Sequence, residues 1–287
     1  MENNNNNNNT TANNNSTENA ITINKESLTD KRYVGILLSV LSLIASIILT
    51  LIFTPNVLTY KYFIFQCVLN VAISVGVLYV VKPLFGKNIN EIFKFKNAKT
   101  ALILSVGIFI LMVYFFILIL KKMNHTSVPF KLILAILIYS LTIGLFNGIV
   151  IVFLTSEGYF HLENKSITYK YIYAVAGAFI YGLFNIIITH GGFEAFFQYF
   201  TLMFALATVY ILSRNVLIVM IINAVFWFEY FLLIVVLLSS LNNLFEMAFG
   251  NSNTIINILF VLVLVYAAVM LYIMDKPKEK QPEEFMV

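Results

Sequence analysis

Charged residues are scarce in this chain. They make up 11% of its 287 residues, whereas an average soluble protein carries about a quarter. Hydrophobic residues make up 60%. A soluble fold of this length has too little volume to hide that much apolar surface, so the composition excludes a soluble globular protein and favours a polytopic membrane protein. The net charge of +4 lies in loops and tails, and we predict no nucleic-acid binding.

Cysteine is also scarce, and the common catalytic motifs are missing. Cys67 is the one cysteine, which excludes an intrachain disulfide and a metal cluster built from cysteines. The chain has no His-Glu-x-x-His zinc motif, no Gly-rich phosphate loop and no Gly-x-Ser-x-Gly elbow. We therefore predict neither a bound metal nor another cofactor.

What the sequence does contain is a series of apolar segments of about 18 to 25 residues, each long enough to cross a bilayer core of roughly 30 Å. They lie near 34–53, 62–81, 101–120, 132–154, 171–189, 196–213, 216–240 and 254–274. This pattern predicts an all-α, polytopic transmembrane bundle of about eight helices. Lysine and arginine concentrate in the tails and the even-numbered loops, and the other side holds only Lys61, Lys121, Lys122 and Lys131. By the positive-inside rule, both termini are predicted to be cytosolic.

The chain divides into three regions. Residues 1–30 are Asn-rich and of low complexity, with too little apolar surface to fold, and we expect a disordered cytosolic tail. Residues 31–275 form the membrane domain, and 276–287 form a charged cytosolic tail. The sequon at Asn124 falls on the non-cytosolic side and is a candidate for N-glycosylation. The endoplasmic reticulum is favoured over the plasma membrane as the location.

Polar side chains within the predicted spans point to a site, because hydrocarbon offers them no water. The tetrapeptide Gly-Leu-Phe-Asn occurs twice and places Asn147 and Asn185 in the fourth and fifth spans. Asn223 and Glu229 lie in the seventh span. From the helix rise, Asn147 and Asn223 lie roughly 10 to 12 Å below the cytosolic ends, whereas Asn185 and Glu229 lie at roughly 20 Å. These four residues predict a polar intramembrane seam between the fourth, fifth and seventh helices.

The surroundings of the asparagines resemble the CPBP intramembrane protease family, which includes the CAAX prenyl endopeptidases and relatives linked to bacteriocin immunity. The similar stretches are TIGLFNGIVIVFL, AFIYGLFNII and FTLMFALATVYILSRNVLIVMIINAVFW, within about 135–235. Family members carry Glu-Glu-x-x-x-Arg, then Phe-x-x-x-His, then a His followed four residues later by Asn or Asp. The resemblance implies a water activated by glutamate, with histidines that bind a metal or stabilise the oxyanion.

This chain departs from the family at every one of those motif positions. Asn147 and Gly148 stand in place of the paired glutamates, and Val152 in place of the arginine. Asn185 and Asn223 replace the two histidines, and Trp227 replaces the final Asn. Asn is no general base at neutral pH and a poor metal ligand beside His. We therefore expect a degenerate, catalytically inactive member of the family, although enzymatic activity stays an open question.

Three functions fit the sequence. The first is an inactive CAAX protease-like protein, a pseudoenzyme that binds or scaffolds hydrophobic partners, prenylated proteins or other membrane proteins within the lipid bilayer. The second is a small transporter or channel that uses Glu229 as a protonatable carboxylate, although the chain shows no inverted repeat. The third is an active CAAX-type endopeptidase with relocated residues, such as Glu229 and His190. We favour the first.

Overall fold

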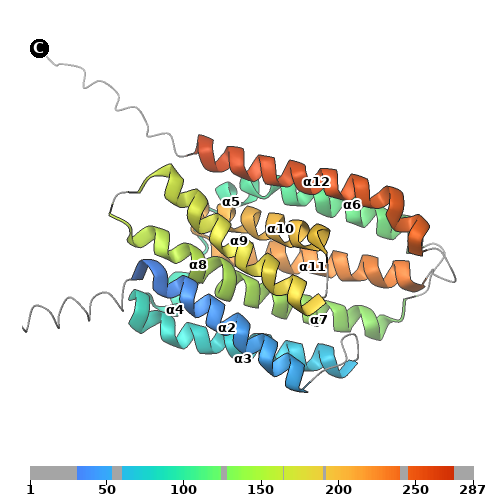
Figure 1. Cartoon of the computed structure of the whole chain (residues 1–287), viewed down its shortest axis with the longest axis horizontal. Coiled ribbons are helices and arrows are strands. Elements are labelled where there is room, and N and C mark those ends of the chain that lie inside the picture. The colour runs from blue at the N-terminus through green and yellow to red at the C-terminus, as the bar shows by residue number, and fades with distance from the viewer. Residues whose placement is uncertain are drawn as a thin grey trace, which may run out of the picture.

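The computed structural model describes residues 31–53, 60–123, 128–163, 165–189, 192–239 and 245–274. Those ranges are helical and contain no strand, and eight of their helices are long and apolar enough to cross a membrane. This confirms the predicted all-α, polytopic bundle (Figure 1). The predicted tails at 1–30 and 276–287, the sequon at Asn124 and His190 all lie outside the described residues.

Eight long helices build the bundle, and short elements connect or extend them. The long helices are α2 (Lys31–Phe53), α3 (Tyr60–Phe85), α6 (Val106–Met123), α7 (Phe130–Phe146), α9 (Ile167–Thr189), α10 (Phe193–Ser213), α11 (Val216–Ser239) and α12 (Phe245–Ile273). The short helices α4 (Ile89–Ile92) and α5 (Ala98–Leu104) precede α6. Three further elements continue α7: the π-helix η1 (Asn147–Phe153), α8 (Leu154–Glu157) and the 3₁₀-helix η2 (Gly158–His161).

Two predicted spans differ from the observed helices. The span expected at 132–154 runs from Phe130 to His161, because the TSEGYFH segment stays helical and is mostly buried instead of forming a loop. The span expected at 101–120 begins in α5 and is interrupted at Ser105. The Ser105 hydroxyl donates a hydrogen bond to the Ala101 carbonyl at 2.7 Å. Such local bonding of a serine to the preceding turn bends helices.

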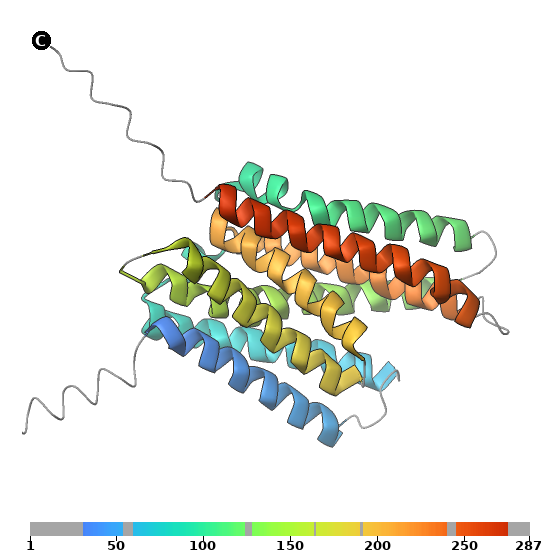
Figure 2. The same ribbon diagram turned by 45° about the horizontal axis from the view of Figure 1, so that its top comes forward.

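The first described helix begins, and the last one ends, on the same side of the bundle (Figures 1 and 2). We call this side the terminal end, where α2 begins at Lys31 and α12 ends at Ile273. α7 and its extension run toward the terminal end, and α11 runs away from it (Figure 1). An even number of spans brings the two ends of the helical bundle to the same side. The predicted topology, with both termini cytosolic, requires this arrangement.

The distribution of side chains is that of a membrane protein. On α2, the serines and the threonine face the bundle, since Ser39, Ser42, Ser46 and Thr50 are buried. The outward face of the same helix carries Leu37, Leu41, Ile44 and Ile48, all largely exposed. Small polar residues at helix contacts and large apolar residues outside are typical of helices packed in lipid. This arrangement supports the multi-pass assignment made from composition.

Glycines allow the helices to cross closely. A Cβ added at Gly35 of α2 would collide with the carbonyl of Leu154, and one added at Gly144 of α7 would lie 2.6 Å from the carbonyl oxygen of Met220 in α11. Gly144 and Gly148 form a Gly-x-x-x-Gly pair, the spacing that lets two membrane helices approach. The backbone contact at Gly35 leaves no flexible atom that can move aside.

We predict that Gly35→Ala destabilises the protein by about 1–3 kcal/mol, because the methyl group overpacks a contact with backbone. Gly76→Ala is the matched control. Gly76 lies within α3 with no atom within 4 Å of the added Cβ, so the change should be neutral or stabilise the helix by about 0.5–1 kcal/mol. Thermal unfolding of the two purified variants in detergent checks this, and equal melting temperatures would contradict it.

Candidate functional site

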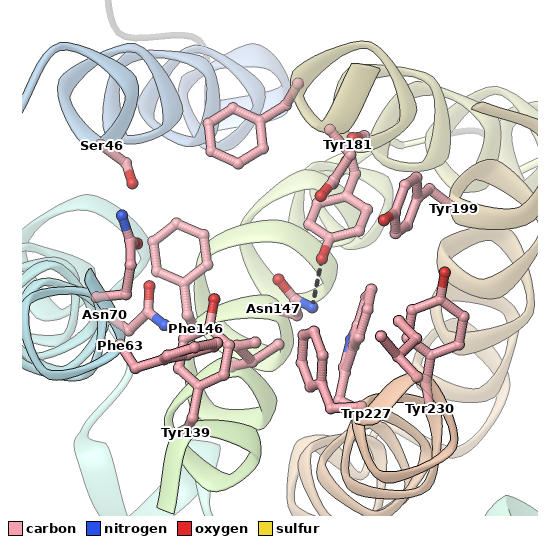
Figure 3. A pocket seen from close by; sticks show the side chains of 16 residues that line it. Ser46, Phe63, Asn70, Tyr139, Phe146, Asn147, Tyr181, Tyr199, Trp227 and Tyr230 are labelled. Carbon is pink, nitrogen blue, oxygen red and sulfur yellow. Dashed lines mark hydrogen bonds between the residues drawn. The ribbon is translucent and has the colours of Figure 1, made fainter. Parts of the chain in front are cut away.

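A cavity with a volume of about 330 Å³ lies among six of the long helices and η1 (Figure 3). Its lining residues are Ser46, Phe63, Gln66, Asn70, Tyr139, Ile143, Phe146, Asn147, Tyr181, Phe184, Asn185, Tyr199, Trp227, Tyr230, Phe231 and Ile234. Phe63 lies near the start of α3, and Asn185 and Ile234 lie near the ends of α9 and α11. The cavity therefore occupies the half of the bundle away from the terminal end.

Tyr181 of α9 joins two of the predicted asparagines. The Asn147 amide donates a hydrogen bond to the Tyr181 hydroxyl at 2.9 Å (Figure 3). The Asn185 amide donates to the backbone carbonyl of Tyr181, also at 2.9 Å. The two Gly-Leu-Phe-Asn tetrapeptides thus place their asparagines on one cavity. Gly182, in the second copy, lets Phe196 of α10 approach, since an added Cβ would lie 2.7 Å from its ring.

A second polar wall faces these residues from α2 and α3. The Gln66 side-chain amide donates a hydrogen bond to the Thr50 hydroxyl at 2.6 Å, and Thr50 donates to the Ser46 carbonyl at 2.6 Å. Ser46, Gln66 and Asn70 all line the cavity. The Gln66 and Asn70 side chains of α3 therefore contribute to the same cavity as Asn147 and Asn185.

Trp227 of α11 lines the cavity between stacked aromatic rings. Its ring lies 5.7 Å from that of Tyr199 and 5.3 Å from that of Phe231, both in stacked geometry. The side chain is only 4% exposed, and its indole Nε1 is buried without a hydrogen-bond partner among the described residues. Buried indole N–H groups usually have a partner, so this donor is an unsatisfied buried polar group among the described residues.

Asn223 and Glu229, the other residues of the predicted seam, do not line this cavity. Asn223 is fully buried, and neither side-chain atom has a hydrogen-bond partner in the described chain. It lies between Met220 and Ala224, the α11 residues nearest to Gly144. Glu229 is partly buried with one unpartnered carboxylate oxygen. It lies about 200° around the helix from Trp227. Gly148 and Val152 are buried in η1.

The sequence interpretation missed a buried ionic cluster at the terminal end. Glu157 is 1% exposed and forms an ion pair with Lys87. Its other carboxylate oxygen accepts a hydrogen bond from the Tyr210 hydroxyl at 2.9 Å. His161 Nε2 lies 3.7 Å from the carboxylate, and the His161 ring stacks on Phe85 at 5.6 Å. The i,i+4 spacing of Glu157 and His161 is a signal in the sequence, but the distant Lys87 is not.

This cluster connects α8 and η2 to α10 and to the loop after α3. Arg214, at the end of α10, lies 3.3 Å from the centre of the Phe160 ring and adds a cation–π contact beside it. The cluster holds the terminal end of the bundle together and does not border the cavity. Its acid and cations are compensated by one another, so we assign it to stability.

We predict that Lys87→Met lowers stability by about 3–5 kcal/mol, since it leaves the buried Glu157 carboxylate without its cation. The double variant Lys87→Met with Glu157→Gln should recover most of that loss, because no unpaired charge remains. Thermal unfolding of Lys87→Met, Glu157→Gln and the double variant gives the coupling energy between the two side chains. Purely additive losses would show that the ion pair is not the stabilising contact.

The cavity wall carries no residue that exchanges a proton readily near neutral pH. Its polar residues are serine, asparagine, glutamine, tyrosine and tryptophan, with no Asp, Glu, His, Lys or Cys among the described lining residues. Across the described ranges, no cluster of three or more His, Cys, Asp or Glu side chains is arranged to hold a metal ion. The lining groups can form hydrogen bonds and apolar contacts.

Comparison with known proteins gives no relative. No family model, curated protein or solved structure matches the chain. What the fold shows is plain. The chain is a multi-pass membrane protein. A proposal for its function therefore has to be argued from the geometry and chemistry of the structure itself.

We predict that Asn223→Leu raises the melting temperature. Leucine has a similar size and removes a buried amide that has no partner. An unsatisfied buried polar group costs about 1–3 kcal/mol. Asn147→Leu is the comparison, because it removes the hydrogen bond to Tyr181 and should not stabilise. Thermal unfolding of both variants checks the contrast, and destabilisation by Asn223→Leu would mean that the amide has a role.

Proposed function

We propose that this protein is a non-enzymatic binding protein of the membrane, which holds a lipophilic partner in the cavity around Asn147, Tyr181 and Trp227. The observation that carries the proposal is the cavity's composition. Aromatic rings make up most of its wall, and neutral amides and hydroxyls supply its polar groups. Ligand pockets of about 300–1,000 Å³ are lined in this way, with apolar side chains and a few polar groups that orient the ligand.

The absence of an acid–base pair from the cavity wall supports binding rather than hydrolysis. A hydrolase needs a group that takes a proton from water, and the described lining residues include no carboxylate or imidazole. Asn147 is instead held by its hydrogen bond to Tyr181. We therefore propose that any ligand leaves the cavity chemically unchanged.

The partner's class follows, within the proposal, from the resemblance to the CPBP family. Asn147, Asn185 and Trp227 occupy positions that match the family's motifs, and all three line the cavity. We propose a lapsed member that has kept a place for prenyl chains or prenylated proteins. Phe63, Phe184 and Phe231 are only partly buried at the cavity wall, which supports entry of such a chain from the bilayer.

Glu229 favours a second candidate, a proton-coupled transporter. One of its carboxylate oxygens is buried without a hydrogen-bond partner in the described part of the chain, and a carboxylate within a membrane span is a functional candidate by default. Its position off the cavity wall weighs against coupling to a ligand held there. We therefore rank the transporter second.

The test uses a fluorescein-labelled farnesylated peptide and the same peptide without the farnesyl group. We expect fluorescence anisotropy to show saturable binding of the farnesylated peptide to the purified protein in nanodiscs. Asn147→Ala should weaken this binding about fivefold to tenfold, since Tyr181 and the cavity wall lose a hydrogen bond. Tyr266→Phe is the control, because the Tyr266 hydroxyl donates to Ile103 outside the cavity.

Three outcomes bear on the alternatives. Cleavage of the farnesylated peptide, followed by mass spectrometry, would overturn the non-enzymatic proposal. Glu229→Gln should leave peptide binding unchanged. If the wild-type protein in liposomes shows proton-coupled uptake that Glu229→Gln abolishes with the fold intact, the transporter candidate replaces the binding protein. Equal binding of the farnesylated and the unmodified peptide would contradict the proposal that the cavity binds a lipophilic group.

A further inference from the structure

A second pocket lies at the terminal end of the bundle, where α3 ends and α4 follows (Figure 1). Its volume is about 470 Å³. Tyr79 and Lys82 line it from α3, and Asn88, Asn90 and Glu91 line it from α4 and the residue before that helix. It shares no lining residue with the cavity around Asn147. The two sites are therefore separate, and the pocket does not depend on the proposed function.

Backbone contacts hold α4 beside the last turn of α3. Gly86, directly after α3, adopts a φ of +70°, which a glycine tolerates without strain. Its N–H donates a hydrogen bond to the Lys82 carbonyl at 2.8 Å, so the chain turns back at this point. Ile92 is 5% exposed and anchors α4 in the core. The Asn88 N–H donates to the Glu91 carboxylate at 3.3 Å and closes the first turn of α4.

The pocket wall carries two opposite charges that are not paired. Lys82 and Glu91 form no ion pair with each other or with another described residue. Lys87, which lies between them in the sequence, is paired with the buried Glu157 instead. The two asparagines of the wall add neutral hydrogen-bonding groups. A complementary ligand supplies an anion for Lys82 and a cation for Glu91, which is the charge pattern of a zwitterion.

An apolar stripe leads from this pocket along the outer face of α3. Val71, Val75 and Tyr79 follow one another at intervals of four residues and are 39%, 42% and 75% exposed. Lys82 comes three residues after Tyr79, so all four lie on one face of the helix. The apolar span of α3 ends at Phe85, and the ends of spans lie at the level of the lipid head groups, where tyrosine is enriched. A ligand held at Lys82 can therefore extend a hydrocarbon chain along the stripe.

We infer that this pocket binds a phospholipid with an ethanolamine head group. The phosphate lies beside the Lys82 ammonium, the primary ammonium of the lipid donates a hydrogen bond to the Glu91 carboxylate, and an acyl chain follows Val75 and Val71. A choline head group has a cation but no N–H donor, and a glycerol head group has hydroxyl donors but no cation. Each is a weaker partner for Glu91, because a hydrogen bond between two charged groups is the strongest of these contacts.

The test compares three dioleoyl phospholipids, which carry ethanolamine, choline or glycerol head groups. Each is titrated against the purified protein in a nonionic detergent, and native mass spectrometry measures the fraction of protein with bound lipid. We expect the ethanolamine lipid to bind about threefold to fivefold more tightly than the other two, the scale of one solvent-exposed charge pair. Glycerophosphoethanolamine, which has the head group but no acyl chain, should not displace it.

Two variants separate the two charges of the pocket. Glu91→Gln should lower the affinity for the ethanolamine lipid to that for the choline lipid, which it should leave unchanged. Lys82→Gln should weaken both lipids by the same factor, because both present a phosphate. Lys94→Gln and Glu163→Gln are the matched controls, since these side chains are exposed and do not line the pocket. If a variant fails to fold, as judged by gel filtration, the lipid series with wild-type protein still decides the inference.

Each contrary result overturns a particular part of the inference. Equal binding of the ethanolamine and choline lipids would contradict the bond to Glu91. Binding of the glycerol lipid as tight as that of the ethanolamine lipid, or tighter, would show that Lys82 alone attracts an anionic lipid. Displacement by glycerophosphoethanolamine would rule out the acyl chain, and equal losses in the control variants would show an effect of surface charge only. The farnesylated-peptide experiment tests the other cavity, so the proposed function and this inference can fail separately.

Discussion

The close crossing of α11 over α7 and η1 is the contact on which the rest of the site depends. Gly144 and Gly148 have no side chains that would hold these helices apart, and Met220 and Ala224 of α11 occupy the space. Without a hydrophobic driving force between helices in lipid, close van der Waals contact of this kind stabilises the bundle. Asn147 at the crossing and Trp227, three residues after Ala224, line the same cavity. The Gly-x-x-x-Gly pair therefore sets both the packing and the position of the candidate site.

Buried polar groups of the described chain gather at the terminal end and around the cavity, and these two places differ in chemistry. At the terminal end, Glu157, Lys87 and Tyr210 satisfy one another, as a buried charge requires. In the other half, the cavity contains neutral groups, of which the Trp227 indole has no partner in the described chain. A compensated charge cluster is suited to holding helices together. An incompletely bonded neutral cavity is suited to receiving a ligand.

The sequence predicted the helices well because their signal is local. A run of about 20 apolar residues must span a bilayer whatever its neighbours are, and the eight expected spans correspond to observed helices. The sequence places Asn147 and Asn185 in neighbouring spans, and the structure shows both lining one cavity. Glu157 was missed because its ion-pair partner lies 70 residues away. Asn223 and Glu229 show the same limit, since helix rise gives the depth of a residue but not the neighbours it faces.

By itself, the sequence determined that this is a multi-pass helical membrane protein, since composition and segment length leave the backbone no other way to satisfy its hydrogen bonds in lipid. It also placed Asn147, Asn185, Asn223 and Glu229 within the predicted spans. Only the tertiary structure decided how polar residues are grouped: Asn147 and Asn185 with Tyr181 in a cavity, Asn223 in a closed helix crossing, and Glu157 in an ionic cluster. The physical reason is that grouping depends on helix rotation and close approach, and these are set by contacts between residues far apart in the chain.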